Sequence, residues 1–268
     1  MPELPEVETI VRDLNKFLLN KTFSDVIVHD DLVLGGPSDE FVQRLKGQTV
    51  KKIFRRGKAV AMPLASEEFL VAQPMMTGQL VFNASEDKHT RITFIFSDGA
   101  KLLYNDQRRF GRLRVVKNLN EIKYFNILGP EPFSKEFTSE YVRKALKKTA
   151  RPIKNLLLDH TFVAGIGNIY ACEILFHAGV SPKRPACRVS PFKVDVMHRE
   201  IIRVLREAIT FRGSSIRNYR DGSGQKGKFN QHLAVYGRQG LPCPRCQSLI
   251  QRIVQSARST FYCVRCQK

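Results

Sequence analysis

The sequence predicts an α+β fold, in which a β-rich region is followed by a helical region and a small C-terminal cysteine module. Between residues 22 and 116, short apolar or alternating runs are separated by turn residues, as in a β-sandwich or barrel. Beyond residue 140, apolar residues recur at helical spacing. Two Cys-x-x-Cys pairs lie near the end of the 268-residue chain, which is long enough for two domains.

A helix is expected over residues 5–19, before the β-rich region. Its apolar residues recur every three or four positions: Val7, Ile10, Val11, Leu14, Phe17 and Leu18. Pro5 suits the first helical turn, where its missing N–H costs nothing. Glu6 and Glu8 lie near the positive end of the helix dipole, which favours negative charge.

The elements that follow are expected in this order. The strand-like runs are TFSDVIVHD at 22–30, TVKKIF at 49–54, AVAMPLA at 59–65, RITFIFSDG at 91–99 and RLRVV at 112–116, and the SDG at 97–99 predicts a hairpin turn. GPEPFSKEFT at 129–138 indicates a linker, and helices are expected over 141–149, 153–160, 168–178 and 194–210. A basic stretch rich in Gly and Ser, residues 212–230, indicates a mobile loop.

The charge of the chain points to a polyanionic partner. Lys and Arg number 44 against 25 Asp and Glu, so the net charge is +19. Nucleic acid is the expected partner, with an anionic membrane surface as the alternative. No apolar run approaches the ~18–20 residues of a membrane span, and the N-terminus lacks a signal-peptide pattern. We therefore expect a cytoplasmic, nucleoid-associated protein.

The C-terminal cysteines predict one structural zinc site. Cys243, Cys246, Cys263 and Cys266 form Cys-x2-Cys-x16-Cys-x2-Cys, a spacing that closes one tetrahedral thiolate site and leaves no ligand position open. Four free thiols are the alternative. The residues between the pairs alternate as in a two-stranded ribbon, with Arg258 at or near its tip, where it contacts phosphate or is a solvated surface charge.

A glycine-containing turn precedes the helix expected from residue 168. Such a turn exposes the N–H groups of the helix start, which is a natural phosphate seat, although glycine turns before helices are also common. Asn168 can cap this helix or bind the anion itself. Glu173, further along the helix, is either a functional group or a salt-bridge partner.

Three basic or sulfur-containing turns belong to the β-rich region. In NDQRRFGR at 105–112, a cation and a ring on one loop can enter a duplex and replace a removed base, unless Phe110 lies in the core. In FRRGKAV at 54–60, Lys58 either projects into a cleft or belongs to a solvated turn. The two methionines of QPMMTGQL at 73–80 would ordinarily fill the core.

The first residues suggest covalent chemistry. If Met1 is removed, Pro2 becomes the N-terminus, with a secondary amine. Because α-amines in model peptides titrate near ~7.7–8, far below lysine, part of this amine is expected to be unprotonated at neutral pH. Its attack on the anomeric carbon of a sugar gives an iminium, an electron sink for further bond cleavage. Glu3 and Glu6 are near enough to move protons. The alternative is a helix start with favourable carboxylates and an incidental proline.

Taken together, these motifs resemble one family. MPELPEVET, RRGK, MTGQL, DQRRFG, LGPEP, IKNLLLD, VAGIGNIYACE, VYGRQG and the cysteine module are similar, in order and from residue 2 to 268, to formamidopyrimidine-DNA glycosylases. The resemblance implies an N-terminal catalytic β-sandwich over 1–131 that carries the N-terminal helix, a helix–two-turn–helix domain over 132–233 and a β-hairpin zinc finger over 234–268. It also implies that the protein binds damaged double-stranded DNA. The sequence shows no oligomerisation signal, so a monomer is expected, and no membrane partner is expected.

The family excises oxidised purines, chiefly 8-oxoguanine and formamidopyrimidines, and then cleaves the strand by β,δ-elimination. By resemblance, Pro2 is the Schiff-base nucleophile, Glu3 the acid that assists base loss and ring opening, and Glu6 a second carboxylate near the amine. Lys58 matches the lysine assigned to β-elimination and phosphate contact. Arg258 matches the arginine that grips phosphate and is assigned to δ-elimination.

The resemblance also implies a DNA-binding set. Met76, Arg108 and Phe110 match the side chains that fill the gap left by the everted nucleotide, with Arg108 facing the orphaned cytosine. Lys154 and Asn168 match phosphate ligands, and Glu173 and the 213–229 loop match parts that receive the flipped base. The other residues expected to contact DNA are His89, Arg91, Arg151 and Tyr236.

The sequence departs from the family pattern at two places. Gln73-Pro74-Met75 replaces His-Leu-Gly, which leaves open whether Met75 or Met76 is the wedge, and the Thr-Gly neighbour favours Met76. Arg91 replaces the second histidine of His-x-His, where a phosphate contact is still expected.

Two alternative functions remain. An oxidised-pyrimidine glycosylase of the endonuclease VIII type typically begins Pro-Glu-Gly-Pro-Glu, so Leu4 and the zinc module with Gln267 favour the purine class. A damage-binding protein that does not cleave DNA would lack the nucleophile or the acid, whereas Pro2, Glu3 and Lys58 are all present.

Overall fold

The computed structural model of the protein describes residues 1–216 and 218–268. The chain divides into two compact units, and each is described by itself. Unit 1 comprises Met1–Asn126 and Ile209–Asn230, and unit 2 comprises Ile127–Ala208 and Gln231–Lys268. These units differ from the three consecutive segments expected from the sequence, because residues 209–230 return to the N-terminal unit. The three-segment division stays a prediction.

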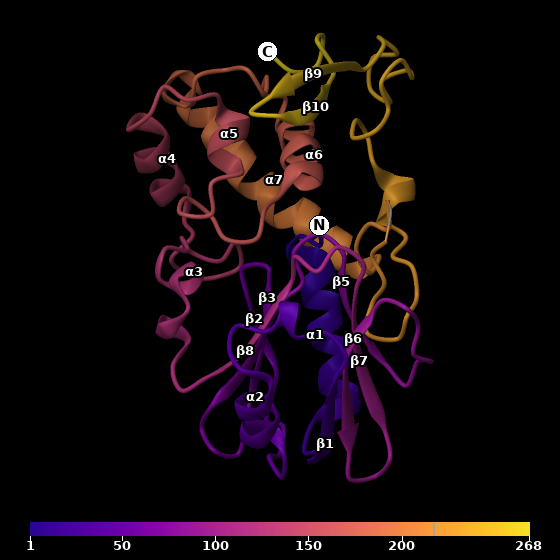
Figure 1. Ribbon diagram of the computed structural model, residues 1–268. Coiled ribbons are helices and arrows are strands. Elements are labelled where there is room, and N and C mark those ends of the chain that lie inside the picture. Colours follow the sequence, from indigo (N-terminus) through magenta and orange to yellow (C-terminus); the bar gives the residue numbers. More distant parts are fainter. Residues whose placement is uncertain (217) are drawn as a thin grey trace. The chain divides into compact units, whose positions relative to one another are not determined.

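Unit 1 is a β-sandwich that includes a long helix. Its helical elements are α1 (Leu4–Leu18), η1 (Asp31–Val33), α2 (Ser38–Leu45), η2 (Leu119–Glu121) and α3 (Lys123–Asn126). Its strands are β1 (Phe23–Val28), β2 (Phe54–Arg56), β3 (Ala59–Pro63), β4 (Phe69–Gln73), β5 (Gly78–Phe82), β6 (Thr90–Phe96), β7 (Lys101–Asp106) and β8 (Arg112–Val116). They form two antiparallel sheets, ordered β1-β6-β7-β5 and β2-β3-β4-β8 (Figure 1).

The core of unit 1 joins α1 to both sheets. α1 contacts β2 and β3 of one sheet and β5 of the other. Val7, Ile10 and Leu14 are fully buried in the same cluster as residues from both sheets. This burial of one apolar stripe stabilises the helix far more than its intrinsic propensity does. The N-terminal helix and the β-sandwich predicted from the sequence are therefore confirmed.

Two local expectations in unit 1 need correction. The stretch 49–54 is not one strand, because β2 starts only at Phe54. Just before it, the N–H of Ile53 donates to Asn15 Oδ1 at 2.9 Å, and the carbonyl oxygen of Ile53 accepts from Asn15 Nδ2 at 2.7 Å. α2 was not expected within the β-rich region. The turn SDG is confirmed, since Gly99 has a φ of +82° and its N–H bonds to Phe96 O at 2.9 Å between β6 and β7.

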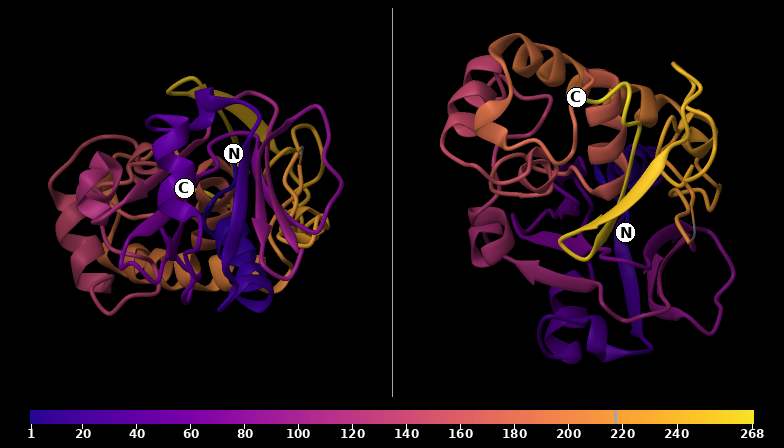
Figure 2. Two further views of the ribbon diagram at one scale, coloured as in Figure 1. Left: turned by 60° about the horizontal axis from the view of Figure 1, so that its bottom comes forward. Right: turned by 90° about the horizontal axis from the view of Figure 1, so that it is seen from above.

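Unit 2 combines helices with a C-terminal hairpin. Its helical elements are α4 (Ser139–Lys147), α5 (Ile153–Leu157), α6 (Asn168–Ala178), η3 (Ala186–Arg188) and most of α7 (Pro191–Thr210), and η4 (Phe229–His232) lies across the boundary between the units. α5 ends earlier than expected because Asp159 Oδ1 accepts the N–H of Thr161 at 2.9 Å and turns the chain. The hairpin consists of β9 (Gln251–Gln255) and β10 (Arg258–Tyr262), and it lies beside α6, which β10 contacts (Figures 1 and 2).

The hairpin has the turn that the sequence predicted. Gln255 pairs with Arg258, so Ser256 and Ala257 form a two-residue turn, and both have positive φ values of +48° and +58°. Arg258 therefore starts β10 directly after the tip. Among the described helices, none combines the length and the apolar character that crossing a lipid bilayer requires.

Candidate active site and nucleic-acid interface

The N-terminal candidates lie where α1 begins. Pro2 and Glu3 are buried, and Glu3 is the N-cap residue of the helix. The N–H of Glu3 donates to Glu6 Oε2 at 2.7 Å, and Glu6 is 1% exposed. The folded helix thus brings Pro2, Glu3 and Glu6 together, at a helix terminus whose positive potential disfavours an ammonium group.

Lys58 occupies the turn between β2 and β3. It is 8% exposed, and its N–H donates to Tyr124 Oη at 3.0 Å. Arg55 fixes the turn against α1, since its guanidinium bonds to Glu8 Oε2 at 3.2 Å and to Gly57 O at 2.9 Å. The alternative of a solvated turn is wrong for Lys58, which is buried. Sequence reasoning did not identify Arg55 as its support.

The three candidate intercalating residues form one cluster. Met76 is 42% exposed and Phe110 is 48% exposed. The guanidinium carbon of Arg108 lies 4.4 Å from the Phe110 ring centroid, and Arg108 Nη1 lies 3.3 Å from Met76 Sδ. The alternatives that place Phe110 or Met76 in the core are therefore wrong. Met75 is equally exposed, but its backbone has a φ of +49°.

Asp106 holds this cluster in place and was missed from the sequence. It is fully buried at the end of β7. Its Oδ1 accepts the N–H of Arg108 at 3.1 Å and the hydroxyl of Thr77, and its Oδ2 accepts the N–H of Gly111 at 2.8 Å. One carboxylate therefore ties the turn next to Met76 to the loop that carries Arg108 and Phe110. The sequence signal for this role was that Asp106 is the one acidic residue in the basic stretch 105–112.

His89 and Arg91 are placed differently from each other. His89 is half-buried in the turn before β6. Arg91 is 9% exposed, and its guanidinium bonds to Asp106 O at 2.9 Å and pairs with Asp30 Oδ2 at 3.6 Å. Asp30 also binds Arg109 at 2.9 Å, so Arg91 supports the loop of the cluster. Contact of Arg91 with phosphate stays a prediction.

The four cysteines of unit 2 form a metal site. Their sulfur atoms all lie within 4.8 Å of one another. Cys243 Sγ and Cys266 Sγ are 3.9 Å apart, and Cys246 Sγ and Cys263 Sγ are 3.4 Å apart. Zinc bound at ~2.3 Å by four tetrahedral thiolates separates them by about 3.8 Å. The residues present therefore fit one structural zinc ion.

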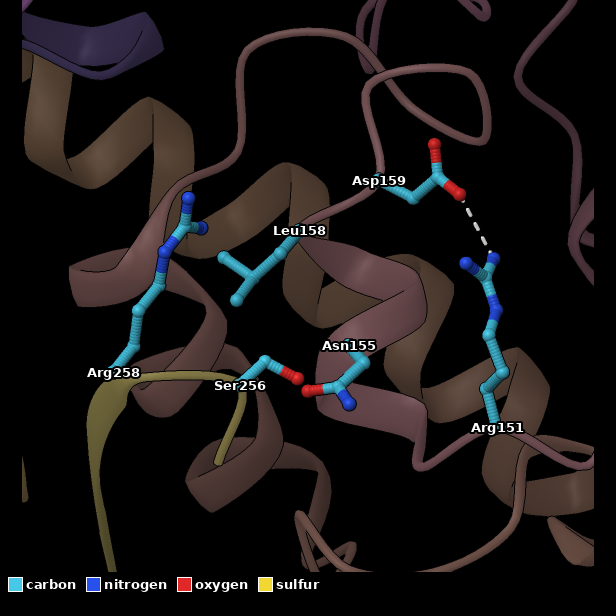
Figure 3. A pocket seen from close by; sticks show the side chains of 6 residues that line it. All are labelled: Arg151, Asn155, Leu158, Asp159, Ser256 and Arg258. Atoms are coloured by element: carbon cyan, nitrogen blue, oxygen red, sulfur yellow. Dashed lines mark hydrogen bonds and ion pairs between the residues drawn. The ribbon is translucent and has the colours of Figure 1, made fainter. Parts of the chain in front are cut away.

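Arg258 lines a hollow of about 390 Å³ in unit 2, together with Arg151, Asn155, Leu158, Asp159 and Ser256 (Figure 3). The exposed Arg258 side chain extends from the hairpin beside Leu158. Arg151 donates to Asp159 Oδ2 at 2.8 Å. Two guanidinium groups on one hollow suit an anion, although one of them already has a carboxylate partner.

Lys154 and Asn168 both bind the strand that carries Arg258. Lys154 is fully buried, and its Nζ donates to Thr260 Oγ1 at 2.7 Å and lies 3.5 Å from Ser259 O. Asn168 Nδ2 donates to Ser259 O at 2.8 Å. The expectation that Asn168 caps α6 is wrong, because Gly167 is the N-cap residue. In unit 2 both side chains position β10, and their contact with phosphate stays a prediction.

Glu173 holds the chain that leads to the cysteine module. Its carboxylate accepts the N–H groups of Ala234, Val235 and Tyr236 at 2.8, 3.0 and 2.8 Å. Burial raises the pKa of Glu173, and these three donors oppose that rise. The Tyr236 ring packs edge-on against Phe261 of β10 at 5.1 Å. The sequence suggested either a salt bridge or a contact with the flipped base for Glu173, and it did not predict these bonds to the backbone.

Glu173→Gln should therefore destabilise unit 2. An amide cannot accept three N–H groups as a carboxylate does, so we expect the free energy of unfolding to fall by about 2–4 kcal/mol. Chemical denaturation measures this change. Glu140→Gln, at an exposed pair on α4, is the control and should change it by less than ~0.5 kcal/mol. Unchanged stability of Glu173→Gln with a loss of base excision alone would instead support a base contact.

Comparison with known proteins agrees with this architecture. Family models match three consecutive parts: the formamidopyrimidine-DNA glycosylase N-terminal domain over residues 1–113, its H2TH domain over 128–220, and the zinc finger found in FPG and IleRS over 240–268. The chain is 43% identical over its whole length to the formamidopyrimidine-DNA glycosylase of Shouchella clausii, and the match covers 99% of that protein.

Solved structures are similar over the whole chain as well. The MutM (Fpg) protein of Thermus thermophilus is 38% identical, with a TM-score of 0.91 over 99% of this chain and 98% of that one. An Fpg mutant of Lactococcus lactis in complex with Fapy-dG DNA is 33% identical, with a TM-score of 0.93 over 100% of both chains. The same bacterium's Fpg was also solved with DNA that contains an abasic site.

The β-sandwich with Pro2 and Glu3 at its start, the helical H2TH unit and the four-cysteine hairpin together define a zinc-finger repair-enzyme architecture. The chain belongs to the formamidopyrimidine-DNA glycosylase family.

Proposed function

We propose that the protein is a bifunctional DNA glycosylase and AP lyase, which excises oxidised purines from duplex DNA and then cleaves the strand. The observation that carries this proposal is the set of candidate catalytic residues in a chain that matches a family member over 99% of its length, with Pro2 and Glu3 buried at the start of α1. Relatives were solved with DNA that contains Fapy-dG or carbocyclic 8-oxoguanine. The net charge of +19 suits a polyanionic substrate.

The amine of Pro2 is the nucleophile of the proposed reaction. After removal of Met1, its nitrogen attacks C1′ of the damaged nucleotide, the bond from C1′ to the base breaks, and the base leaves with the proton that the amine loses. Glu3 donates the proton that opens the sugar ring, and the iminium that forms acts as an electron sink. Loss of a C2′ proton then expels the 3′-phosphate, and loss of a C4′ proton expels the 5′-phosphate. Glu6 keeps Glu3 at the helix start, because its carboxylate accepts the N–H of Glu3.

Two cations are proposed to stabilise the departing phosphates. Lys58 is held on the β2–β3 turn, which Arg55 ties to Glu8 of α1. Arg258 is held on the zinc hairpin, where Lys154 and Asn168 fix the neighbouring Ser259 and Thr260. We assign the β-elimination step to Lys58 and the δ-elimination step to Arg258. Each supplies a charge-assisted contact to an oxygen on which negative charge develops.

Phe110→Ala should slow excision from a duplex. The Met76, Arg108 and Phe110 cluster fills the gap that an everted base leaves, and stacking on a base contributes about 1–3 kcal/mol per aromatic, so excision should slow roughly 10- to 100-fold. Single-turnover kinetics on a duplex with 8-oxoguanine measures this change. Phe192→Ala, at an exposed ring on α7, is the control and should not alter the rate. Equal rates for wild type and Phe110→Ala would contradict a wedge.

Excision kinetics on paired duplexes tests the function itself. One duplex carries 8-oxoguanine opposite cytosine and the other carries thymine glycol. We expect faster excision from the first, with a borohydride-trapped covalent adduct. Preference for thymine glycol would support an enzyme of the endonuclease VIII type. Binding of either duplex without an adduct or cleavage would support a damage-binding protein.

A further inference from the structure

One face of α1 carries two buried carboxylates. Glu6 and Asp13 are seven residues apart, which is two helical turns, so they lie on the same side of the helix. They are 1% and 2% exposed. Buried carboxylates are stable only where hydrogen bonds or cations compensate their lost hydration. The proposed chemistry uses Glu6 and leaves Asp13 without a role.

Both carboxylates bind the same distant segment of unit 1, residues 212–222. Glu6 Oε1 accepts the N–H of Ser214 at 2.7 Å. Asp13 Oδ2 accepts the N–H of Gly222 at 3.2 Å and pairs with the guanidinium of Arg212. The segment is therefore bonded along about two turns of α1. Residue 217 lies outside the described residues.

Arg212 joins Asp13 to a second buried carboxylate. Its Nε donates to Asp221 Oδ2 at 2.8 Å, and Asp221 is fully buried. Asp221 Oδ1 accepts the N–H groups of Ser223 and Gln225 at 3.0 and 2.8 Å. Burial raises the pKa of Asp13, and Arg212 opposes that rise. Removal of one partner from such a cluster leaves an uncompensated buried charge, which is costly.

Two glycines allow this close approach. A Cβ at Gly222 would lie 2.7 Å from Asp13 Cβ, and a Cβ at Gly213 would lie 2.7 Å from Glu6 Oε1. Gly213 also has a φ of +77°. Both positions therefore exclude side chains because the segment touches the two carboxylates of α1. At these two points the glycines allow the segment to contact the helix.

The same segment reaches the intercalating cluster. Two residues of β5 donate to the segment. The N–H of Phe82 donates to Gly222 O at 2.9 Å, and Gln79 Nε2 donates to Asn218 O. Asn218 Nδ2 donates to Gln107 Oε1 at 3.1 Å, next to Arg108. The segment thus runs from the helix that starts at the candidate nucleophile to the loop that carries the candidate wedge. If Pro2 attacks the sugar while the wedge fills the gap in the stack, the everted base is expected beside a segment that contacts both features.

We propose that Asp13 is a positioning residue, which holds the 212–222 segment along α1 so that the segment borders the base to be excised. The proposal rests on the proposed glycosylase activity. Because an abasic nucleotide has no base to border, Asp13 should matter for excision and not for cleavage at a preformed abasic site. A merely structural role would affect both reactions alike.

The test compares Asp13→Asn with the wild type, both full-length and zinc-loaded. Single-turnover rates are measured on a duplex with 8-oxoguanine opposite cytosine and on the same duplex with a preformed abasic site. We expect Asp13→Asn to slow excision roughly 10- to 100-fold, as for a misplaced substrate contact, with abasic cleavage unchanged. The variant Arg212→Gln should slow excision at least as much, because it removes the partner of both Asp13 and the buried Asp221.

Asp98→Asn is the matched control, since Asp98 pairs with Lys21 at the exposed surface of the same unit, and it should leave both rates unchanged. If Asp13→Asn does not fold, Arg212→Gln is compared in the same way. Equal slowing of both reactions, or no slowing of excision, would overturn the positioning role. Absence of excision by the wild type, with abasic cleavage or without it, would overturn the proposed function and this proposal with it.

Discussion

An enzyme whose Pro2 amine is blocked by a retained N-terminal extension should neither form a borohydride-trapped adduct nor cleave abasic DNA. The nitrogen then belongs to an amide, which has no lone pair available for attack on C1′. Loss of a covalent nucleophile typically lowers the rate by a factor on the order of 10³ or more. Strand cleavage is measured by gel electrophoresis of a labelled abasic duplex.

The control carries the same extension at the C-terminus and should cleave DNA like the untagged enzyme. Binding of the abasic duplex should also persist in the blocked form, because the phosphate contacts of both units remain. Normal nicking by a fully blocked preparation would show that another group, such as Lys58, is the nucleophile.

Cys263→Ser should remove zinc and abolish strand cleavage. Cys263 is fully buried in the four-sulfur cluster, and structural zinc sites contribute apparent binding free energies of about 10–16 kcal/mol. A two-stranded hairpin is marginal by itself, so β9 and β10 should unfold without the ion. Arg258 is then no longer held in place, and Lys154 loses its hydrogen-bond partners on β10. We expect cleavage to fall at least about 100-fold, a loss typical of displaced catalytic groups.

Cys187→Ser is the control for this variant, because Cys187 is exposed and lies outside the cluster. It should retain one zinc per chain by metal analysis and cleave DNA normally. Full activity of a zinc-free Cys263→Ser enzyme would contradict the role of the hairpin.

Features with a strong local signal could be predicted from the sequence. α1 followed from apolar spacing, and the zinc hairpin followed from four cysteines and an alternating pattern. α2 was missed because its eight residues lie inside a β-rich stretch. Its signals are acids in the first turn, Arg44 in the last turn, and buried Phe41 and Leu45 four residues apart.

The contacts that position the candidate groups could not be predicted, because they join distant parts of the chain. Lys154 binds Thr260 across 106 positions, and Asn168 binds Ser259 across 91. Local pattern contains no information about such partners. The resemblance implied phosphate contacts for both residues, and these contacts stay a prediction; it did not indicate that in unit 2 both residues hold the strand of Arg258.

The contacts of the 212–230 stretch could not be predicted from its composition. Gly and Ser indicated a mobile loop, which stays a prediction, and composition did not show that Arg212, Ser214 and Gly222 bond to α1. The glycines permit close approach to buried carboxylates, and this requirement becomes visible only once the helix and the segment are placed together.

Mapping the trapped adduct is the most direct test of the central claim, that the amine of Pro2 bonds covalently to the sugar. The wild-type enzyme is trapped with borohydride on an 8-oxoguanine duplex, digested with nuclease and protease, and analysed by mass spectrometry. The account predicts a sugar remnant on the nitrogen of Pro2 in chains that lack Met1. A remnant on Lys58, or an adduct formed by chains that retain Met1, would contradict it.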